Sequence, residues 1–161
     1  QCEVTNASVP GTDEPCSLES PCGDGLACLG AYSWGQGGWC VPAWFAKDFY
    51  SHDAQAIPEG RTPYSSTIVA CGLASVPVDI VVRLHLDHPR PEDLFVQLED
   101  PNGQIGTILD REPWSPGPII ARVGSGDDAV NGNWTLHVRD MVTGETGILT
   151  AWSLYLLSNW D

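Results

Sequence analysis

Acidic side chains are the residues of this sequence best suited to chemistry, and they gather in segments that we expect to be loops. The groups are Asp87, Glu92 and Asp93; Asp127 and Asp128; and Asp140 and Glu145. Calcium prefers carboxylate and carbonyl oxygens and takes about six to eight of them. Loops far apart in sequence that meet at one end of a β-sandwich could supply such a set. The other interpretation is an acidic rim that only water contacts.

Serine, histidine and aspartate are all present, but no catalytic motif connects them. The sequence has no Gly-x-Ser-x-Gly turn and no His-Glu-x-x-His zinc motif. We expect His85 and His137 to face solvent or a neighbouring strand, because they lie opposite the apolar side of their strands. His88, in a proline-rich loop, and His52, in an acidic segment, are weaker metal candidates. We therefore do not expect this chain to be an enzyme by itself.

The cysteines predict disulfide bonds rather than a zinc site. Cys2, Cys16, Cys22, Cys28 and Cys40 lie in the first 45 residues, and Cys71 follows. Their number is even and no Cys-x-x-Cys pair occurs, which is typical of exported proteins. Residues 1–45 are also rich in Gly and Pro, so cross-links must replace a core there. Six cysteines allow fifteen pairings, and the sequence alone selects none of them.

An aromatic cluster lies between Tyr32 and Tyr50. Its tryptophans, Trp34, Trp39 and Trp44, would form a stacking platform for a sugar if they faced solvent along one groove. Aromatic side chains also fill small cores. We expect this second arrangement, in which the aromatic side chains pack between the cysteine-rich segment and the rest of the chain.

The net charge excludes several classes of partner. The sequence has 21 Asp and Glu against 7 Lys and Arg, which gives a formal charge of −14. Such a field repels nucleic-acid phosphates and anionic lipids. No apolar run approaches the roughly 18 residues that cross a bilayer. We expect a monomer that is secreted or otherwise extracellular, in a periplasm or at a cell surface, and whose partner is another protein.

Short strands are predicted from residue 66 onward. Residues 66–70 and 119–123 are rich in β-branched side chains, and residues 78–86 alternate between apolar and mostly polar positions. Residues 94–99 and 104–109 form a predicted hairpin. They are joined by Asp100-Pro-Asn-Gly103, which has the residues of a type I turn. No stretch of ten or more residues from Val78 onward keeps the spacing of an amphipathic helix.

The last predicted strands each carry a tryptophan near the start. Trp134, Leu136 and Val138 share one face, as do Trp152, Leu154 and Leu156. Gly144 and Gly147 lie between the strands, where the chain can turn back. We therefore expect the two strands to pair with each other. The predicted fold is an all-β, jelly-roll-like β-sandwich over residues 46–161, preceded by a small disulfide-rich cap over residues 1–45.

The predicted strands and turns resemble a known family. The segments that carry the resemblance are Val78–Leu86, Glu92-Asp93-Leu94, Asp100-Pro101-Asn102-Gly103, Asn131–Leu136 with Asp140, and Gly147–Leu154. In this order they resemble the P domain, or Homo B domain, of kexin-like and furin-like proprotein convertases. The resemblance extends from about residue 56 to residue 157. Glu92 departs from it, because the family usually has Gly there, and the cysteine-rich cap lies outside the pattern.

The resemblance implies a jelly-roll module that stabilises or docks onto a neighbouring subtilisin-like protease catalytic domain or other secreted protein. It also implies that Asp93 and Asp140, which lie at motif positions, are the calcium ligands to expect. The cap resembles small interleaved disulfide knots, which implies the bonds Cys16–Cys28 and Cys22–Cys40 and leaves Cys2 for Cys71. The alternative function is a carbohydrate-binding or cell-surface-binding module that uses the aromatics of residues 32–50.

Overall fold

The computed structural model describes residues 12–31, 35–113, 119–122 and 129–160, which form strands with one turn of 3-10 helix. The first six strands are β1 (Pro15–Ser17), β2 (Leu26–Leu29), β3 (Gly37–Pro42), β4 (Ala46–Ser51), β5 (Gln55–Ile57) and β6 (Tyr64–Ala70). The others are β7 (Val76–Asp87), β8 (Leu94–Glu99), β9 (Ile105–Asp110), β10 (Ile119–Arg122), β11 (Gly132–Asp140) and β12 (Gly147–Asn159), with the 3-10 turn η1 at Pro91–Asp93. The described part of the chain contains no helix able to cross a membrane.

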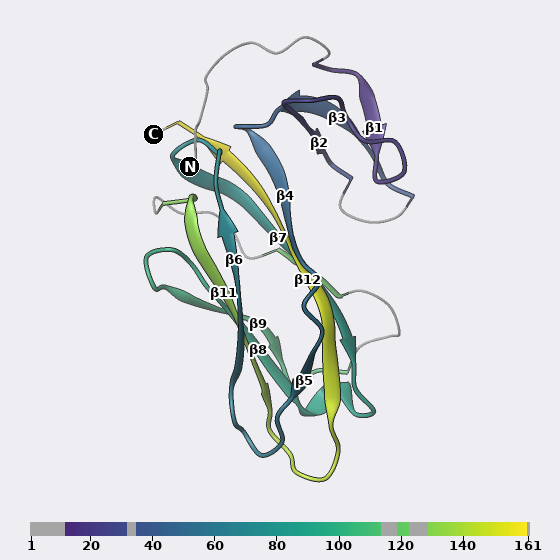
Figure 1. Ribbon diagram of the computed structural model, residues 1–161, viewed down its shortest axis with the longest axis vertical. Coiled ribbons are helices and arrows are strands. Elements are labelled where there is room, and N and C mark those ends of the chain that lie inside the picture. Colours follow the sequence, from purple (N-terminus) through teal and green to yellow (C-terminus); the bar gives the residue numbers. More distant parts are fainter. Residues whose placement is uncertain (1–11, 32–34, 114–118, 123–128, 161) are drawn as a thin grey trace.

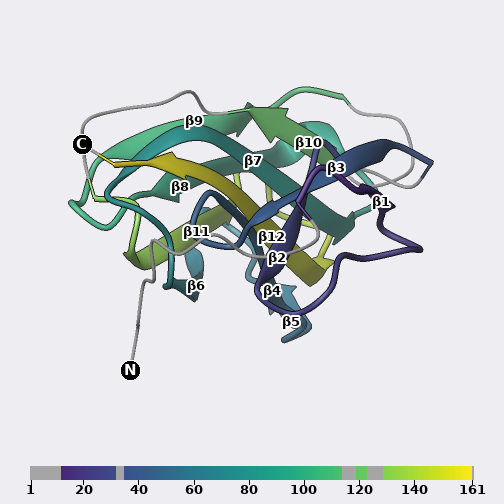
Figure 2. The same ribbon diagram turned by 90° about the horizontal axis from the view of Figure 1, so that it is seen from above.

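The strands form three antiparallel sheets (Figures 1 and 2). We call the five-stranded sheet, in which β10, β7, β12 and β4 follow in order and β5 also pairs with β12, the large sheet. The four-stranded sheet β6-β11-β8-β9 is the small sheet, and β1-β3-β2 is the cap sheet. The large and small sheets face each other as a sandwich, which confirms the predicted all-β, jelly-roll-like fold.

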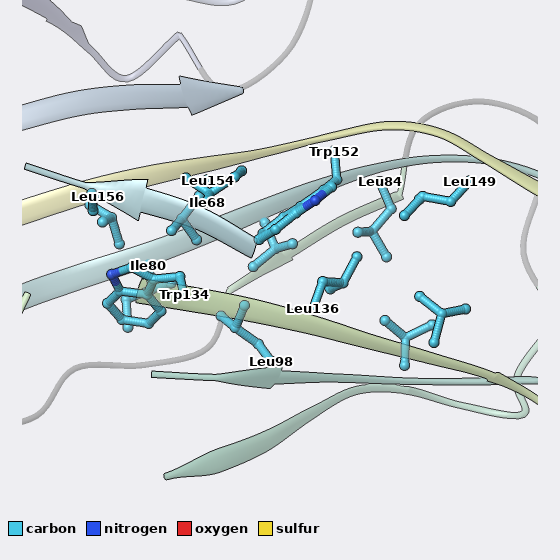
Figure 3. Packing of buried hydrophobic residues seen from close by; sticks show 14 of the residues in the cluster. Ile68, Ile80, Leu84, Leu98, Trp134, Leu136, Leu149, Trp152, Leu154 and Leu156 are labelled. Carbon is cyan, nitrogen blue, oxygen red and sulfur yellow. The ribbon is translucent and has the colours of Figure 1, made fainter. Parts of the chain in front are cut away.

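The sandwich core follows the predicted alternation. Trp134, Leu136 and Val138 of β11 are buried, and so are Trp152, Leu154 and Leu156 of β12. They meet side chains from β6, β7 and β8 between the two sheets (Figure 3). The Trp134 indole donates a hydrogen bond to the Val130 carbonyl at 2.9 Å. Each indole therefore contributes a large apolar surface while its polar N–H keeps a partner.

The predicted pairing of the two tryptophan strands is wrong. β11 pairs with β6 and β8 in the small sheet, whereas β12 pairs with β4, β5 and β7 in the large sheet. The chain between Asp140 and Gly147 crosses from one sheet to the other, so the two indoles enter one core from opposite layers (Figure 3). Alternation specifies which face of a strand is apolar, but it does not specify the strand's partner.

The hairpin of β8 and β9 is confirmed. Val96 lies opposite Leu109 and Glu99 opposite Ile105. The Gly103 N–H donates to the Asp100 carbonyl at 3.0 Å, which closes the predicted turn. The Asp100 side chain also accepts from the Asn102 and Gln104 N–H groups at 2.9 and 2.8 Å. This turn could be predicted because its proline, its glycine and its side-chain acceptor all act locally.

The cap sheet packs on the outer face of the large sheet. Ala46, Val81, Tyr155 and Leu157 are buried there against Ala27, Leu29, Val41 and Phe45. The Tyr155 hydroxyl donates to the Cys28 carbonyl at 2.7 Å. The predicted boundary after residue 45 falls between β3 and β4. β4 itself was not predicted, because its mixed residues lie within the aromatic run.

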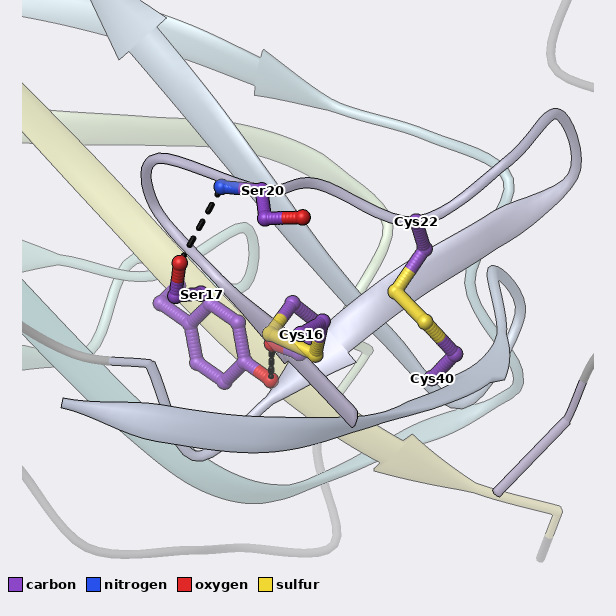
Figure 4. The surroundings of a disulfide bond; sticks show 7 residues. Cys16, Ser17, Ser20, Cys22 and Cys40 are labelled. Carbon is purple, nitrogen blue, oxygen red and sulfur yellow. Dashed lines mark hydrogen bonds between the residues drawn. A yellow bond between two sulfur atoms is a disulfide. The ribbon is translucent and has the colours of Figure 1, made fainter. Parts of the chain in front are cut away.

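Two disulfides hold the cap sheet (Figure 4). Cys16 is bonded to Cys28 with an S–S distance of 2.01 Å, and Cys22 to Cys40 with 2.09 Å. These are the two bonds implied by the resemblance to interleaved knots. Cys71 is also disulfide-bonded. Its expected partner, Cys2, lies outside the described residues.

Candidate functional site

Asp93 and Asp140, the predicted calcium ligands, both lie buried at one end of the sandwich. Asp140 ends β11, and it lies opposite Leu94, the residue after Asp93. The exposed fractions of the two residues are 5% for Asp93 and 0% for Asp140. The Met141 N–H donates to the Asp93 carbonyl at 2.9 Å, which ties the two segments together. The structure therefore brings the two predicted residues to the same place.

The Asp140 carboxylate is paired with His88 in this end of the sandwich. His88 Nε2 lies 3.1 Å from Asp140 Oδ2, and the Val142 N–H donates to Oδ1 at 3.0 Å. The Arg90 N–H donates to His88 Nδ1 at 3.0 Å. Because Nδ1 accepts, the proton of a neutral imidazole lies on Nε2, which donates to the carboxylate. His88, predicted only as a loop residue and a weak metal candidate, is thus a buried partner of Asp140.

Position 147 must be glycine because a side chain there would collide with His88 of this pair. A Cβ at position 147 would lie 2.4 Å from His88 Cδ2 and 2.6 Å from the Asp87 carbonyl oxygen. Gly144 instead has a φ of +116°, the backbone conformation that a turn can require of glycine. Of the two predicted turn glycines, Gly144 therefore shapes the turn, and Gly147 lets β12 pass close to the His88 imidazole.

These side chains do not fit a calcium ion as they are arranged. Both Asp140 oxygens accept hydrogen bonds, and Asp93 Oδ2 lies 3.5 Å from Arg90 Nε. A histidine nitrogen and a guanidinium are poor neighbours for a hard cation that binds oxygen. In residues 12–31, 35–113, 119–122 and 129–160, the one group of potential metal-binding side chains is Cys16, Cys22 and Cys28, whose sulfurs are in disulfides. Asp127 and Asp128 lie outside the described residues, and calcium binding stays a prediction.

The other histidines lie on strands or beside one. His85 is exposed on β7, and His137 contacts side chains of both neighbouring strands, as predicted. Ser65 Oγ lies 2.7 Å from His137 Nδ1, and His137 Nε2 lies 2.6 Å from Glu99 Oε2. Next to them the Thr67 and Thr135 hydroxyls are 3.0 Å apart. These contacts form a row across the outer face of the small sheet, whose strands β6, β11 and β8 are in register.

The Ser65–His137–Glu99 row has the residue types of a nucleophile, a base and an orienting acid. Acyl transfer also needs donors for the oxyanion and a recess that holds the substrate. Ser65 is exposed on the sheet face, and β11 is hydrogen-bonded to strands on both sides, which engages its backbone donors. We interpret the row as a cross-strand hydrogen-bond network, a common means of stabilising a sheet face.

The aromatic cluster is divided between two environments. Phe45 packs beneath the cap, and Trp44 lies 6.0 Å from Phe45 and 5.8 Å from Trp160 between ring centroids. Trp39 is 59% exposed on β3. Trp34 lies outside the described residues. Phe45 and Trp44 thus have the packing role that we expected, and the stacking platform of three tryptophans stays an untested alternative.

A shallow cleft of about 270 Å³ opens between the cap and β4. Lys47, Asp48 and Tyr50 line its β4 side. Asp48 makes an ion pair with Arg83 of β7, whose side chain is 7% exposed and whose Nε has no hydrogen-bond partner among the described residues. Burial raises the pKa of the Asp48 carboxyl, although the Arg83 charge opposes this. Burial and then the Asp48 charge raise the pKa of the Tyr50 hydroxyl.

Sequence reasoning missed this cleft. Asp48 and Tyr50 alternate with Lys47 and Phe49, which is the pattern of a strand, but the segment is short and lies among tryptophans. The partner Arg83 is 35 residues from Asp48, and nothing local links them. The presence of the chain's only lysine beside an aspartate and a tyrosine was the one available signal.

Comparisons with known proteins agree with this fold. Residues 77–156 match the family model described as the proprotein convertase P-domain. Over 102 residues the chain is 26% identical to a transglutaminase-activating metalloprotease of Streptomyces mobaraensis. This alignment covers 62% of this chain and 13% of the metalloprotease. The chain therefore spans a small part of the length of this relative.

Two solved structures share the fold. The serine protease of Aeromonas sobria aligns with a TM-score of 0.52 at 20% identity, over 71% of this chain and 27% of that one. A complex of the A. sobria serine protease with its chaperone aligns with a TM-score of 0.53 at 20% identity, over 72% of this chain and 27% of that one. The family match, the order of the motifs and the sandwich lead to one conclusion: residues 77–156 are a proprotein convertase P-domain.

Proposed function

We propose that this chain is a non-catalytic accessory module of a secreted protein, and that it stabilises or docks onto a neighbouring protease catalytic domain. The observation that carries the proposal is the kind of protein in which similar modules occur. One relative is named a metalloprotease and the other a serine protease. Because those classes use different chemistry, a module common to both is better suited to a task separate from the catalytic step.

The arrangement of side chains supports the same role. The Ser65–His137–Glu99 row lies on an open sheet face, and His88 is closed off with Asp140. The sandwich offers rigid sheet faces and ends, and the cap covers part of one face. The disulfides of the cap fit a protein that works in an oxidising compartment outside the cytoplasm. A rigid, cross-linked body of this kind is suited to holding a partner in its folded state.

The test is to express a subtilisin-like protease catalytic domain from the same source with this chain, without it, and with its Trp152→Ala variant. We expect the yield of soluble protease and its thermal midpoint to fall when the chain is absent or unfolded by the substitution. Trp39→Ala, which changes an exposed side chain, is the matched control and keeps full support. Equal yield and equal midpoint in all four samples would show that the chain does not act on the protease.

A second measurement tests the absence of catalysis. The purified chain and its Ser65→Ala variant are incubated with a p-nitrophenyl ester, and release of the phenolate is followed by absorbance. We expect both proteins to match the buffer rate. Hydrolysis by the unmodified chain that disappears in Ser65→Ala would contradict the non-catalytic assignment.

A further inference from the structure

The cleft between the cap and β4 is not used by the accessory role, and its two sides differ in chemistry. Leu18, Pro21 and Leu26 of the cap supply an apolar side. Lys47, Asp48 and Tyr50 supply a polar and aromatic side. Apolar walls with a few placed polar groups are typical of small-molecule sites, and about 270 Å³ is at the small end of their range. The ligand must therefore be small and must itself have both apolar and polar surfaces.

Tyr50 presents an aromatic ring in this cleft. The residue is 52% exposed on β4. The His52 ring lies parallel to it, with 5.8 Å between centroids and an angle of 6°. The Arg83 guanidinium carbon lies 6.0 Å from the Tyr50 centroid. These neighbours limit the movement of the ring, so a ligand that stacks on it loses little additional conformational freedom.

The ion pair beside Tyr50 supplies a hydrogen-bond acceptor. Arg83 holds the Asp48 carboxylate, whose side chain is still 22% exposed and can accept hydrogen bonds from a ligand. The Lys47 ammonium lies over the Phe49 ring, 5.3 Å from its centroid, and so on the other face of β4. The charges of Arg83 and Asp48 cancel, in a protein of net charge −14. The cleft is therefore close to neutral and does not favour a strongly charged ligand of either sign.

We propose that this cleft binds a small saccharide of one or two rings, which stacks on Tyr50 and donates hydrogen bonds to the Asp48 carboxylate. A pyranose has an apolar ring face and a rim of hydroxyls that can donate, which matches an aromatic ring beside a carboxylate. A polyanion is disfavoured by the surrounding acidic surface. The site differs from the alternative stacking platform of Trp34, Trp39 and Trp44, because its aromatic residue is Tyr50.

The experiment is saturation-transfer difference NMR on the full chain with glucose, galactose, mannose, N-acetylglucosamine and cellobiose as separate probes. We expect millimolar binding of at least one probe, with the strongest transfer to protons on one face of its ring. Tyr50→Ala should weaken that binding by about tenfold, a loss typical of one removed aromatic contact. Tyr50→Phe, which keeps the ring, should weaken it less than Tyr50→Ala does. Trp39→Ala, an exposed aromatic outside the cleft, should leave it unchanged.

Three results would overturn the proposal. None of the five sugars shows transfer, or Tyr50→Ala binds as well as the unmodified chain, or Trp39→Ala loses binding while Tyr50→Ala keeps it. A short acetylated peptide is run as an additional probe, and Tyr50-dependent transfer to it without transfer to any sugar would identify a peptide site instead. Circular dichroism and the thermal midpoint of each variant establish that a loss of binding is not a loss of fold. The protease test above is independent of all these outcomes.

Discussion

The two faces of the large sheet are covered in different ways, although they belong to the same strands. On the inner face, Ile80, Val82 and Leu84 of β7 and Trp152, Leu154 and Leu156 of β12 pack against the small sheet. On the outer face, the alternate residues of these strands include Val81, Arg83, Ser153 and Tyr155. All four are buried, and the cap and β4 contribute to their burial. The inner cover is mainly apolar, and its polar groups include the two indole N–H groups, whereas the outer cover includes a hydroxyl and a guanidinium that need polar partners.

This difference shows how each cover obtains its specificity. An apolar face is satisfied by any well-packed apolar layer of the right volume. The outer face needs particular partners: the Cys28 carbonyl for the Tyr155 hydroxyl, and Asp48 for Arg83. A buried polar group without its partner is costly, so these contacts fix where the cap lies. The inner face should therefore contribute more stability, and the outer face more positional specificity.

The largest expected effect is on the inner face. Trp152→Ala removes a buried indole and its hydrogen bond to Ser66 Oγ at 2.9 Å. We expect the free energy of unfolding to fall by about 3–5 kcal/mol, measured by urea denaturation. Trp39→Ala, at an exposed position, is the control and should change it by no more than about 0.5 kcal/mol. Similar small losses for both variants would mean that the inner core does not dominate.

The next effect is on the cover of the outer face. Replacing Cys16 and Cys28 by serine opens a loop with a sequence separation of 12, which should cost about 3 kcal/mol. We expect hydrogen exchange to accelerate in β1, β2 and β3 while β11 remains protected, because the sandwich keeps its own core. Equal loss of protection in β11 would show that cap and sandwich unfold as one unit.

A smaller effect should follow from removing one polar contact between the cap and the sheet. Tyr155→Phe deletes the hydroxyl that donates to the Cys28 carbonyl and keeps the ring in place. The expected loss is about 1 kcal/mol, with faster exchange confined to the cap strands. Tyr64→Phe, at a half-buried tyrosine of the inner core, is the matched control. The comparison of the two faces fails if Tyr64→Phe disturbs β2 as much as Tyr155→Phe does.

The smallest effect is a dependence on pH that belongs to the outer face alone. Burial raises the pKa of Asp48 above its ordinary value of 3.8, so folding favours the protonated carboxyl. The corresponding stability is present below that value and is lost as the pH rises through the higher pKa of the folded state.

The measurement compares urea unfolding of the unmodified chain and Asp48→Asn at several pH values. The free energy of the unmodified chain should decline relative to the variant as the pH rises above about 4. Ile80→Val on the inner face has no titratable group and should track the unmodified chain with a constant offset. A constant difference between the unmodified chain and Asp48→Asn would contradict the raised pKa.

Local patterns predicted much of the sandwich. The alternation of residues 80–86 identified the inner face of β7, and Asp100 to Gly103 identified a turn that is closed by its own residues. Even within that strand the pattern failed at Val78, which is 45% exposed near the end of the sheet. Periodicity identifies a buried stripe only where a second layer covers it.

The missed features all depend on residues far apart in the chain. Trp134 and Trp152 lie in facing sheets because their strands do not pair with each other. Strand β11 pairs with β6 and β8, and strand β12 pairs with β7. His88 is buried because the fold brings Asp140, which is 52 residues away in the sequence, next to its imidazole. The resemblance named Asp93 and Asp140 as candidate calcium ligands, but the pairing of His88 with Asp140 was visible only in three dimensions.

The place of β12 within the large sheet has a consequence for the order in which the molecule assembles. This strand pairs with β4, β5 and β7, and in those pairs Leu154 lies opposite Phe49 and Val82. During synthesis the ribosome releases β12 after all three of its neighbours, and contacts of such long range form slowly. Strands β6, β8, β9 and β11 emerge earlier and can assemble first. The large sheet therefore stays incomplete, and its apolar inner face uncovered, until β12 has been synthesised.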